Sequence, residues 1–270
     1  MTAIDVVIVA HNAGDLIERA VASVVDDPLV RSVCIVDNAS TDGAPEAVAA
    51  AHPRVRVLRA ENRGFAAGNN LGISAGDAPY VMLLNPDAEM NPGSLALLHS
   101  FASEHSRAGI VGPEILNANG TRQAGSRGRF PTFARVLALH AARVWARITG
   151  AVSPLPKSVT GPTRVDWVTG AAMLVRRAAI EAVGGLDEGF FLYYEDVDWC
   201  HRMHDAGWEV WVVPGATVTH HLGQAGVSSA FAAEKYREAF WRYCEKYRLH
   251  GLKLAARLAL LVRRSAGGRP

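Results

Sequence analysis

The feature that most constrains the fold of this chain is a series of short apolar runs that alternate with helix-like segments. Short apolar runs, typical of buried strands, occupy residues 4–10, 32–36, 55–58 and 80–84, and the first is rich in β-branched residues. Helices are predicted between them, over residues 13–25 and 44–51. Because strands that alternate with helices form βαβ units, the pattern predicts an α/β fold with a mostly parallel central sheet flanked by helices.

A polar cluster follows each of these apolar runs. The clusters are His11-Asn12, Asp37-Asn38, Glu61-Asn62-Arg63 and Asn85-Pro86-Asp87. Any one of them could be a plain turn, since Asn, Asp and Gly favour turns. Four in succession favour a ligand site, because the ligands of such sheets bind just beyond the carboxyl ends of the strands.

Composition narrows the class of protein. The 270 residues include 28 Lys+Arg against 26 Asp+Glu, and this net charge of +2 does not indicate a nucleic-acid partner. The three cysteines have no paired or metal-like spacing, which favours a reducing cytoplasm. The first residues lack the pattern of a signal peptide, and no run reaches the roughly 18 apolar residues of a membrane span. We therefore expect a cytoplasmic protein.

The segment 117–165 differs in character, because it is rich in arginine and interrupted by prolines. Within it, residues 132–149 have the spacing of an amphipathic helix. A strand-like pattern resumes at 166–175, and a helix is predicted over 176–183. We expect all of these elements to belong to one domain over residues 1–225.

Residues 226–270 are expected to form a C-terminal helical extension. Its first helix is predicted over 229–249. The stretch 251–264 combines leucines with lysine and arginine. This is the pattern of a basic amphipathic helix, which lies in the plane of a membrane surface.

Two polar groups have the chemistry of a metal and phosphate site. Asp87 offers a carboxylate, and Mg²⁺ and Mn²⁺ prefer oxygen ligands. His220 and His221 follow an apolar run at 210–213, and a histidine can complete a metal shell or contact phosphate. The alternatives are a plain turn at Asp87 and a surface histidine pair without a role.

Three carboxylates crowd the segment Glu195-Asp196-Val197-Asp198. In a helix, Glu195 and Asp198 would lie on one side, with Asp196 pointing elsewhere. Repulsion among close carboxylates raises the pKa of at least one of them, which suits a general base. Acids near a helix start are also stabilised by the helix dipole, so an ordinary helix N-terminus is the alternative.

Six motifs, taken together and in this order, resemble those of glycosyltransferase family 2. They read VDNASTDG at 36–43, ENRGFAAGNN at 61–70, NPD at 85–87, GAAMLVRR at 170–177, GGLDEGFF at 184–191 and EDVDWCHR at 195–202. Each motif alone is weak, but six in the family's order are specific. Within the family the chain resembles bacterial rhamnosyltransferases that act on polyprenyl-diphosphate-linked sugars, over about residues 4–225.

The resemblance implies a GT-A fold and transfer of a sugar from a nucleoside-diphosphate donor, with inversion at the anomeric carbon. Asp37 would hydrogen-bond the pyrimidine base, and Asp87 matches the last Asp of the family's DXD motif for Mg²⁺ or Mn²⁺. Asn85 stands where that motif has its first acid, so one metal contact departs from the pattern. The expected donor-binding residues are Asn12, Asp37, Asn38, Asn62, Gly64, Gly68, Asn69 and Asp87.

The resemblance also implies roles for the acids and the histidines. Asp196, next to Glu195, would be the general base that deprotonates the acceptor hydroxyl. His220 or His221 would lie near the diphosphate and the metal. The family often has Gly and Ser after this histidine, and here Gln224 stands about where that Ser is expected.

The acceptor implied by the resemblance is a lipid-linked sugar. The residues expected to contact it are Arg127, Arg129, Trp167 and Asp198, since guanidinium groups suit the oxygens of a diphosphate. Such an acceptor lies at the bilayer surface, so we expect peripheral contact with the inner face of the plasma membrane through the insertion 117–165 or the tail 251–264. Alternatively, these segments pack on the catalytic domain or on a second subunit, as in a homodimer.

Other functions stay open at this point. L-rhamnose from dTDP-rhamnose is the expected donor sugar, in cell-wall or polysaccharide synthesis. A family member could instead use UDP-galactofuranose, a UDP-hexose or a UDP-N-acetylhexosamine. A non-catalytic nucleotide-sugar-binding protein is disfavoured by the intact Asp37, Asp87 and Asp196. A Rossmann dehydrogenase is disfavoured because no glycine-rich GxGxxG turn follows the first strand.

The tail pattern yields a test of membrane contact. Ending the chain at Gly251 is expected to lower its recovery with anionic vesicles, because each cationic residue near an anionic leaflet contributes on the order of 1 kcal/mol. Co-sedimentation of the full and shortened chains, at rising anionic-lipid content, measures the difference. Equal, salt-insensitive recovery of both chains in the supernatant would contradict the role of the tail.

Overall fold

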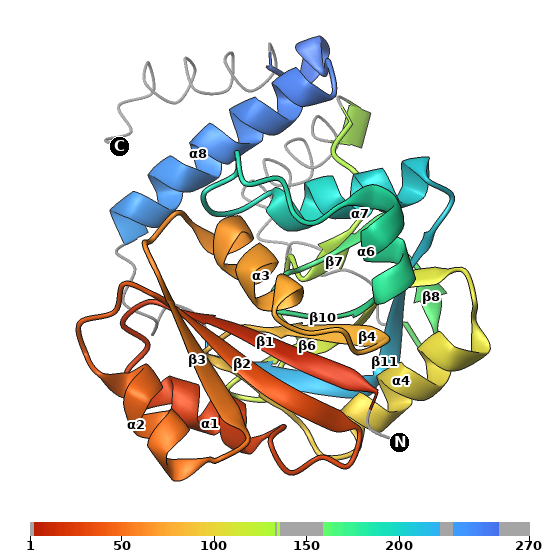
Figure 1. Ribbon diagram of the computed structural model, residues 1–270. Coiled ribbons are helices and arrows are strands. Elements are labelled where there is room, and N and C mark those ends of the chain that lie inside the picture. Colours follow the sequence, from red (N-terminus) through yellow and green to blue (C-terminus); the bar gives the residue numbers. More distant parts are fainter. Residues whose placement is uncertain (1–2, 133, 136–158, 222–228, 254–270) are drawn as a thin grey trace.

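The structure is a computed structural model, which describes residues 3–132, 134–135, 159–221 and 229–253. The strands of its central sheet are β1 (Ile4–Ala10), β2 (Val30–Asn38), β3 (Val55–Ala60), β4 (Tyr80–Leu84), β5 (Ala88–Met90), β6 (Ala108–Asn117), β8 (Thr163–Arg164), β10 (Ala172–Arg176) and β11 (Glu209–His220). Within the described part of the chain, their order is β3-β2-β1-β4-β10-β6-β11-β5, with β8 also paired to β11 (Figure 1). A small antiparallel pair, β7 (Arg127–Gly128) and β9 (Trp167–Val168), stands apart from this sheet.

Strand direction places the polar clusters at one edge of the sheet. β1 pairs in parallel with β2 and β4, and β2 pairs in parallel with β3. Their carboxyl ends therefore point the same way, and the predicted polar clusters follow them. β10 runs antiparallel between β4 and β6, while β6 and β11 are parallel. The sheet is thus mostly parallel, as predicted, with antiparallel neighbours at its centre and at β5.

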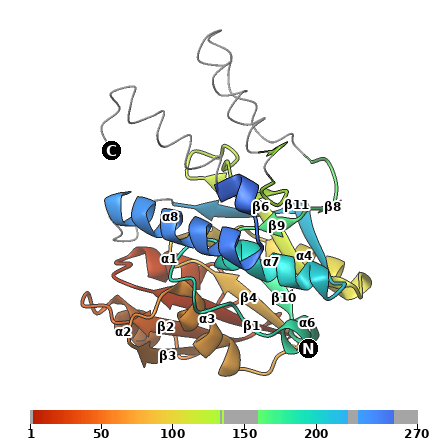
Figure 2. The same ribbon diagram turned by 90° about the horizontal axis from the view of Figure 1, so that it is seen from above.

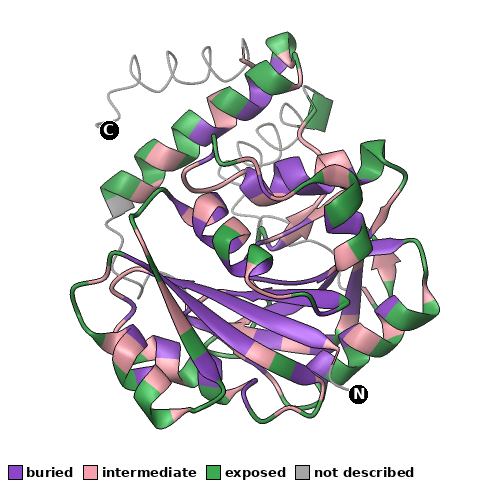
Figure 3. Cartoon of the chain, viewed as in Figure 1, coloured by how far each residue is buried: buried purple, intermediate pink, exposed green. Residues whose placement is uncertain are grey.

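Helices cover both faces of the sheet, because side chains alternate between the faces along each buried strand. The helices are α1 (Leu16–Ala22), α2 (Ala44–Ala51), α3 (Phe65–Ser74), α4 (Ser94–Glu104), α6 (Arg177–Val183), α7 (Glu195–Asp205) and α8 (Ser229–Lys246). Val6 and Ile8 belong to a core shared with α1 and α4, whereas Val7 and Val9 belong to a core shared with α3, α6 and α7. The central strands β1 and β4 are wholly buried between these layers (Figure 3).

Several predicted elements differ in extent from the observed ones. The stretch 166–175 is not one strand: it breaks between β9 and β10, where backbone groups of residues 169–171 form hydrogen bonds with Ser126, Asn85 and the side chain of Asp196 in helix 195–205. The helix predicted over 13–25 is shorter, at Leu16–Ala22. Most of the predicted helix 132–149 and of the tail 251–264 lies outside the described residues.

The helix α8 forms a further layer beyond α3 and α7 (Figures 1 and 2). Val197 of α7 shares an apolar cluster with Ala239 and Tyr243 of α8. No helix of the described residues, α8 included, is long and apolar enough to cross a membrane. The division of the chain after residue 225 stays a prediction.

An ionic cluster also ties α8 to α7. The fully buried carboxylate of Asp198 accepts hydrogen bonds from Arg202 Nε at 3.0 Å and Tyr247 Oη at 2.9 Å, and Lys246 Nζ lies 2.6 Å from it. Lys246 also contacts Asp187 at 2.7 Å. Burial opposes ionisation of Asp187, yet hydrogen bonds from Lys246 and from the backbone hold its pKa at about 2. Lys246 of α8 thereby neutralises the buried carboxylate of Asp198 in the first turn of α7.

This cluster predicts a cost for removing Lys246. Lys246→Met should lower the free energy of unfolding by about 1–3 kcal/mol, because Asp198 stays buried with one charged donor fewer. Lys253→Met is the control, since Lys253 pairs with the exposed Glu245 and such surface pairs contribute about 0–1 kcal/mol. Urea denaturation measures both changes. Equal losses would mean that the burial of Asp198 does not depend on Lys246.

Candidate active site

The carboxyl ends of β1 and β2 bring predicted donor residues together. Asn12 adopts a positive φ of 51°, and its Oδ1 accepts a hydrogen bond from the backbone N–H of Thr41 at 2.8 Å. The buried Asp37 accepts one from the backbone N–H of Ser40 at 2.8 Å. Asn12 therefore holds the turn after β2 against the end of β1, and Asp37 closes that turn from within. A carboxylate and an amide in this position face the edge where ligands of such sheets bind.

Asn38 and Gly64 connect this edge to the start of α3. Asn38 Nδ2 donates to the carbonyl oxygen of Gly64 at 3.1 Å, while its buried Oδ1 has no hydrogen-bond partner among the described residues. Gly64 has a φ of 96°, and a Cβ there would collide with the backbone of Phe191. Only glycine fits this conformation and close approach. The turn is closed by Asn62, whose Oδ1 accepts a hydrogen bond from the N–H of Gly64 at 3.1 Å.

Two predicted donor residues lie inside the fold instead of at its edge. Gly68 is buried, and a Cβ there would lie 2.7 Å from Val9 Cγ1 and 3.1 Å from Asn38 Nδ2. Its small size lets α3 approach β1 closely. Asn69 is 1% exposed, and its amide donates to the carbonyl oxygen of Phe65 at 2.9 Å. Both residues pack between the helix and the sheet, and their role in lining the nucleotide stays a prediction.

Asp87, Asn85 and His220 converge at the next part of the edge. Antiparallel pairing of β11 with β5 sets His220 opposite Ala88, directly after Asp87. His220 Nε2 lies 3.1 Å from Asp87 Oδ1 and 3.4 Å from Asn85 Nδ2. Both the Asp87 and the His220 side chains are 7% exposed. His220 lies more than a hundred positions after Asn85 and Asp87 in the sequence, and the register of β11 against β5 brings it into contact with them.

The second histidine of the pair takes a different partner. His221 Nε2 lies 2.6 Å from Glu89 Oε1, and Glu89 also pairs with Arg19 at 2.6 Å. Only the backbone N–H of His221 reaches Asp87, through the carbonyl oxygen at 2.8 Å. Of the pair, His220 is thus the one whose ring faces Asp87, because successive side chains of an extended segment point to opposite sides.

The chemistry of this group fits a divalent cation. Asn85 Oδ1 is buried and has no hydrogen-bond partner among the described residues, close to a carboxylate and an imidazole nitrogen. The described chain has no cluster of three or more His, Cys, Asp or Glu side chains suited to a metal. A metal at this place would therefore depend on Asn85 and on donor phosphates, as is usual for Mg²⁺.

The start of α7 carries two buried or half-buried acids without a cationic partner in the described residues. Asp196 is held by two backbone N–H groups, of Gly170 at 2.9 Å and of Val197 at 2.8 Å. Glu195 is buried, and its Oε2 has no hydrogen-bond partner. Tyr194, before the helix, has a φ of 66°. As predicted from helical spacing, Glu195 faces inward with Asp198 while Asp196 points elsewhere.

Glu195 and Asp196 have higher pKa values than ordinary surface carboxylates. Burial, and then the charge of Asp196, raise the pKa of Glu195 well above its usual 4.5. Burial also raises the pKa of Asp196, although the backbone N–H groups of Gly170 and Val197 oppose this by stabilising the anion. An acid with a raised pKa and a fixed orientation suits proton transfer.

Two residues predicted to contact the acceptor, Asp198 and Arg127, form ion pairs inside the fold. The carboxylate of Asp198 is fully buried in the cluster with Arg202 and Lys246. The side chain of Arg127 is 9% exposed and pairs with Glu114 at 2.6 Å. The contact of both residues with an acceptor stays a prediction.

The other two acceptor residues lie nearer the surface. Arg129 is 67% exposed and pairs with Asp166 at 2.9 Å. The half-buried Trp167 donates its indole N–H to the carbonyl oxygen of Arg129 at 3.2 Å. Their contact with an acceptor stays a prediction.

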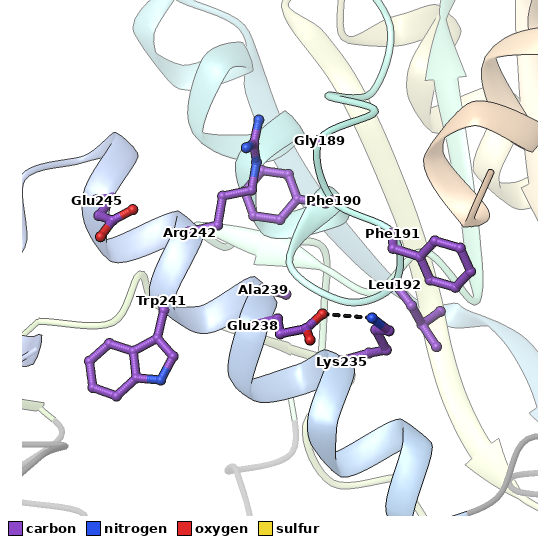
Figure 4. A pocket seen from close by; sticks show the side chains of 10 residues that line it. All are labelled: Gly189, Phe190, Phe191, Leu192, Lys235, Glu238, Ala239, Trp241, Arg242 and Glu245. Carbon is purple, nitrogen blue, oxygen red and sulfur yellow. Dashed lines mark hydrogen bonds and ion pairs between the residues drawn. The ribbon is translucent and has the colours of Figure 1, made fainter.

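A cavity of about 420 Å³ opens between the loop before α7 and α8 (Figure 4). Phe191 and Leu192 line it from the loop, and Lys235, Glu238 and Arg242 line it from α8. Its cations are already paired, Lys235 with Glu238 at 2.7 Å and Arg242 with Asp187 at 3.1 Å. No residue predicted for the site lines this cavity.

Comparison with known proteins places the chain in a family. Residues 5–155 match the model of Glycosyl transferase family 2, so the chain belongs to glycosyltransferase family 2. It is 35% identical over 290 residues to the N-acetylglucosaminyl-diphospho-decaprenol L-rhamnosyltransferase of Mycobacterium tuberculosis, covering 96% of this chain and 93% of the relative. It is also 26% identical to the rhamnosyltransferase WbbL of Escherichia coli, over 69% of this chain and 72% of WbbL.

Solved structures confirm the GT-A fold. One is GalNAc-T7 with UDP, GalNAc and Mn²⁺, with a TM-score of 0.67 and 18% identity over 90% of this chain and 48% of that one. Another is the mannosyltransferase PcManGT of Pyrobaculum calidifontis in complex with GDP-Man and Mn²⁺, with a TM-score of 0.62 and 19% identity over 99% of this chain and 76% of that one. At such identities the likeness concerns the fold alone.

Two residues that shape the site carried little signal in the sequence. Gly170, which holds Asp196, lies within a family motif but reads as an ordinary strand glycine. Gln123, which lies 3.0 Å from the ring of His220, stands in an arginine-rich segment without periodicity. The long-range pairing of β6 and β11 brings it to the histidine, and no local pattern encodes that pairing.

Proposed function

We propose that this enzyme transfers L-rhamnose from dTDP-rhamnose to a polyprenyl-diphosphate-linked sugar, with inversion at the anomeric carbon. The observation that carries the proposal is the 35% identity, over nearly the full length of both chains, to a relative named as an L-rhamnosyltransferase of a diphospho-decaprenol-linked sugar. The placing of Asp37, Asp87 and Asp196 around one end of the sheet supports it, because these acids suit base recognition, metal binding and proton removal.

The donor would lie along the carboxyl ends of β1, β2 and β4. Asp37 would accept a hydrogen bond from the imide N–H of a pyrimidine base, which thymine and uracil share. Asn12, Asn38, Asn62 and Gly64 would shape the loops around the nucleotide. Asp87, Asn85 and His220 would hold Mg²⁺ or Mn²⁺. When bound, the ion would neutralise charge on the leaving diphosphate.

The acceptor side would be served by the start of α7. Asp196 is the general base in this proposal, because its carboxylate is half-buried, lacks a cationic partner in the described chain and is oriented by the N–H of Gly170. Glu195 lies deeper in the fold, where burial and the charge of Asp196 raise its pKa well above 4.5. Arg129 and Trp167 are proposed to contact the acceptor.

The setting of the reaction follows from the acceptor. A polyprenyl-linked sugar lies at the membrane surface, so we propose peripheral contact of a cytoplasmic enzyme with the inner face of the plasma membrane. Homodimerisation through the same surfaces is the alternative use of the basic segments.

A donor screen tests the proposed substrate. The release of nucleoside diphosphate is followed for dTDP-rhamnose, UDP-glucose, UDP-galactose and UDP-N-acetylglucosamine, each with a polyprenyl-diphosphate-linked sugar as acceptor. Acceptor-dependent release from dTDP-rhamnose is expected to exceed the rest. Preference for a UDP-sugar would overturn the rhamnose assignment and keep glycosyl transfer.

The metal assignment predicts a loss of transfer without divalent cations. Asp87→Ala is expected to remove most activity, since the leaving diphosphate then lacks its charge partner. Glu89→Ala is the neighbouring control, because Glu89 pairs with Arg19 and His221 instead. Turnover is measured with Mg²⁺, with Mn²⁺ and with excess chelator. Full turnover in excess chelator would contradict the metal assignment.

The base assignment predicts a split between binding and turnover. Asp196→Asn should lower the rate about 10²–10⁴-fold and still bind the nucleotide sugar. Since burial raises the pKa of Asp196 above the usual 3.8, the wild-type rate should fall on the acidic side of that raised pKa, where the base is protonated. Calorimetry and initial rates across pH measure both. An active Asp196→Asn beside an inactive Glu195→Gln would move the role to Glu195.

A further inference from the structure

The hairpin that follows β6 carries one side chain that the proposed roles leave unused. Gln123 Oε1 lies 3.0 Å from Nδ1 of His220. The other ring nitrogen, Nε2, faces Asp87 Oδ1 at 3.1 Å. One histidine ring therefore stands between an amide on one side and the predicted metal carboxylate on the other.

The backbone around Gln123 is fixed on both sides. Its N–H donates to the carbonyl oxygen of Ile115 at 2.9 Å, and its own carbonyl oxygen accepts a hydrogen bond from Ser126 Oγ at 3.1 Å. The hairpin tip is closed by the N–H of Asn117, which donates to the carbonyl oxygen of Thr121 at 2.7 Å. The amide is thus presented to His220 by a loop with its own hydrogen-bond framework.

Two of the three side-chain contacts of the His220 ring, those with Gln123 and Asn85, fit one tautomer. A neutral imidazole carries a single proton, so one nitrogen donates and the other accepts. Gln123 Oε1 at Nδ1 requires the proton on Nδ1. Asn85 Nδ2, a donor 3.4 Å from Nε2, requires a lone pair on Nε2.

This tautomer leaves acceptors facing one another. Nε2 and Asp87 Oδ1 are then both acceptors at 3.1 Å, and the buried Asn85 Oδ1 has no hydrogen-bond partner in the described chain. A proton shared by Nε2 and Asp87, or a metal cation between them, would satisfy both acceptors. The opposite tautomer would donate Nε2–H to Asp87 and close the pair against a metal.

We propose that Gln123 is a positioning residue, which holds His220 in the Nδ1-protonated tautomer and so keeps Nε2 available to a divalent cation beside Asp87. The inference rests on the metal dependence within the proposed function. Ligating histidines commonly donate their second N–H to such a partner, and losing it typically costs about 10–100-fold in metal affinity or activity.

The first test reads the tautomer in metal-free protein. Long-range ¹H–¹⁵N spectra of histidine-labelled wild type, at a pH where the ring is neutral, should show His220 protonated at Nδ1. Its signal is assigned by its loss in His220→Gln. Gln123→Leu should shift the tautomer balance toward Nε2, and Gln123→Glu, which keeps an acceptor oxygen, should preserve it. A wild-type His220 protonated at Nε2 would overturn the proposal.

The second test reads metal affinity without turnover. Free Mn²⁺ is titrated by electron paramagnetic resonance with the full chain and either dTDP or UDP. Gln123→Leu is expected to weaken Mn²⁺ binding about 10–100-fold, and Gln123→Glu to stay near wild type. Equal affinity of wild type and Gln123→Leu would refute the positioning role, and so would a wild type that retains no Mn²⁺.

The donor screen and the Mn²⁺ titration test two proposals separately, the rhamnose donor and the positioning role of Gln123. Weakened Mn²⁺ binding in Gln123→Leu, together with no transfer from dTDP-rhamnose by wild type, would sustain the positioning role and overturn the rhamnose donor. Rhamnosyl transfer by wild type, together with unchanged Mn²⁺ binding in Gln123→Leu, would sustain the rhamnose donor and overturn the positioning role of Gln123.

Discussion

The parts of the active site are held together by one short turn between β9 and β10. Backbone groups of residues 169–171 make three hydrogen bonds of 2.8–2.9 Å to other elements, and the partners are Ser126, Asp196 and Asn85. The turn therefore joins the hairpin that carries Gln123, the helix that carries the proposed base and the strand end that carries the proposed metal ligand. Since backbone groups make these bonds, their geometry depends on the fold more than on the turn's side chains.

Local patterns predicted the parallel half of the sheet well, because buried strands and the turns after them leave a signal in the sequence. The polar clusters at Asp37 and Asp87 lie at the carboxyl ends of their strands, as predicted. The surroundings of Gly68, Arg127 and Asp198 could not be predicted from local patterns. These polar or small residues lie in the interior, in close packing or in charge pairs, and only long-range partners such as Glu114 reveal this.

Charge compensation divides the acids of α7 into two kinds. Asp198 receives an arginine and a lysine, the latter from α8, and becomes part of the packing. Glu195 and Asp196 receive no cation among the described residues and have raised pKa values, with burial as the main cause. Three neighbouring carboxylates thus acquire different chemistry because α8 neutralises only one of them.

The position of β10 between β4 and β6 bears on how the chain folds as it leaves the ribosome. In the described sheet, β6 pairs only with β10 and β11, both synthesised after it. Until residue 176 has emerged, β4 keeps one unpaired edge and β6 has no neighbour to pair with. Exposed strand edges invite aggregation. The nascent N-terminal half therefore exposes a strand edge until β10 has been synthesised, although it contains most of the proposed donor residues.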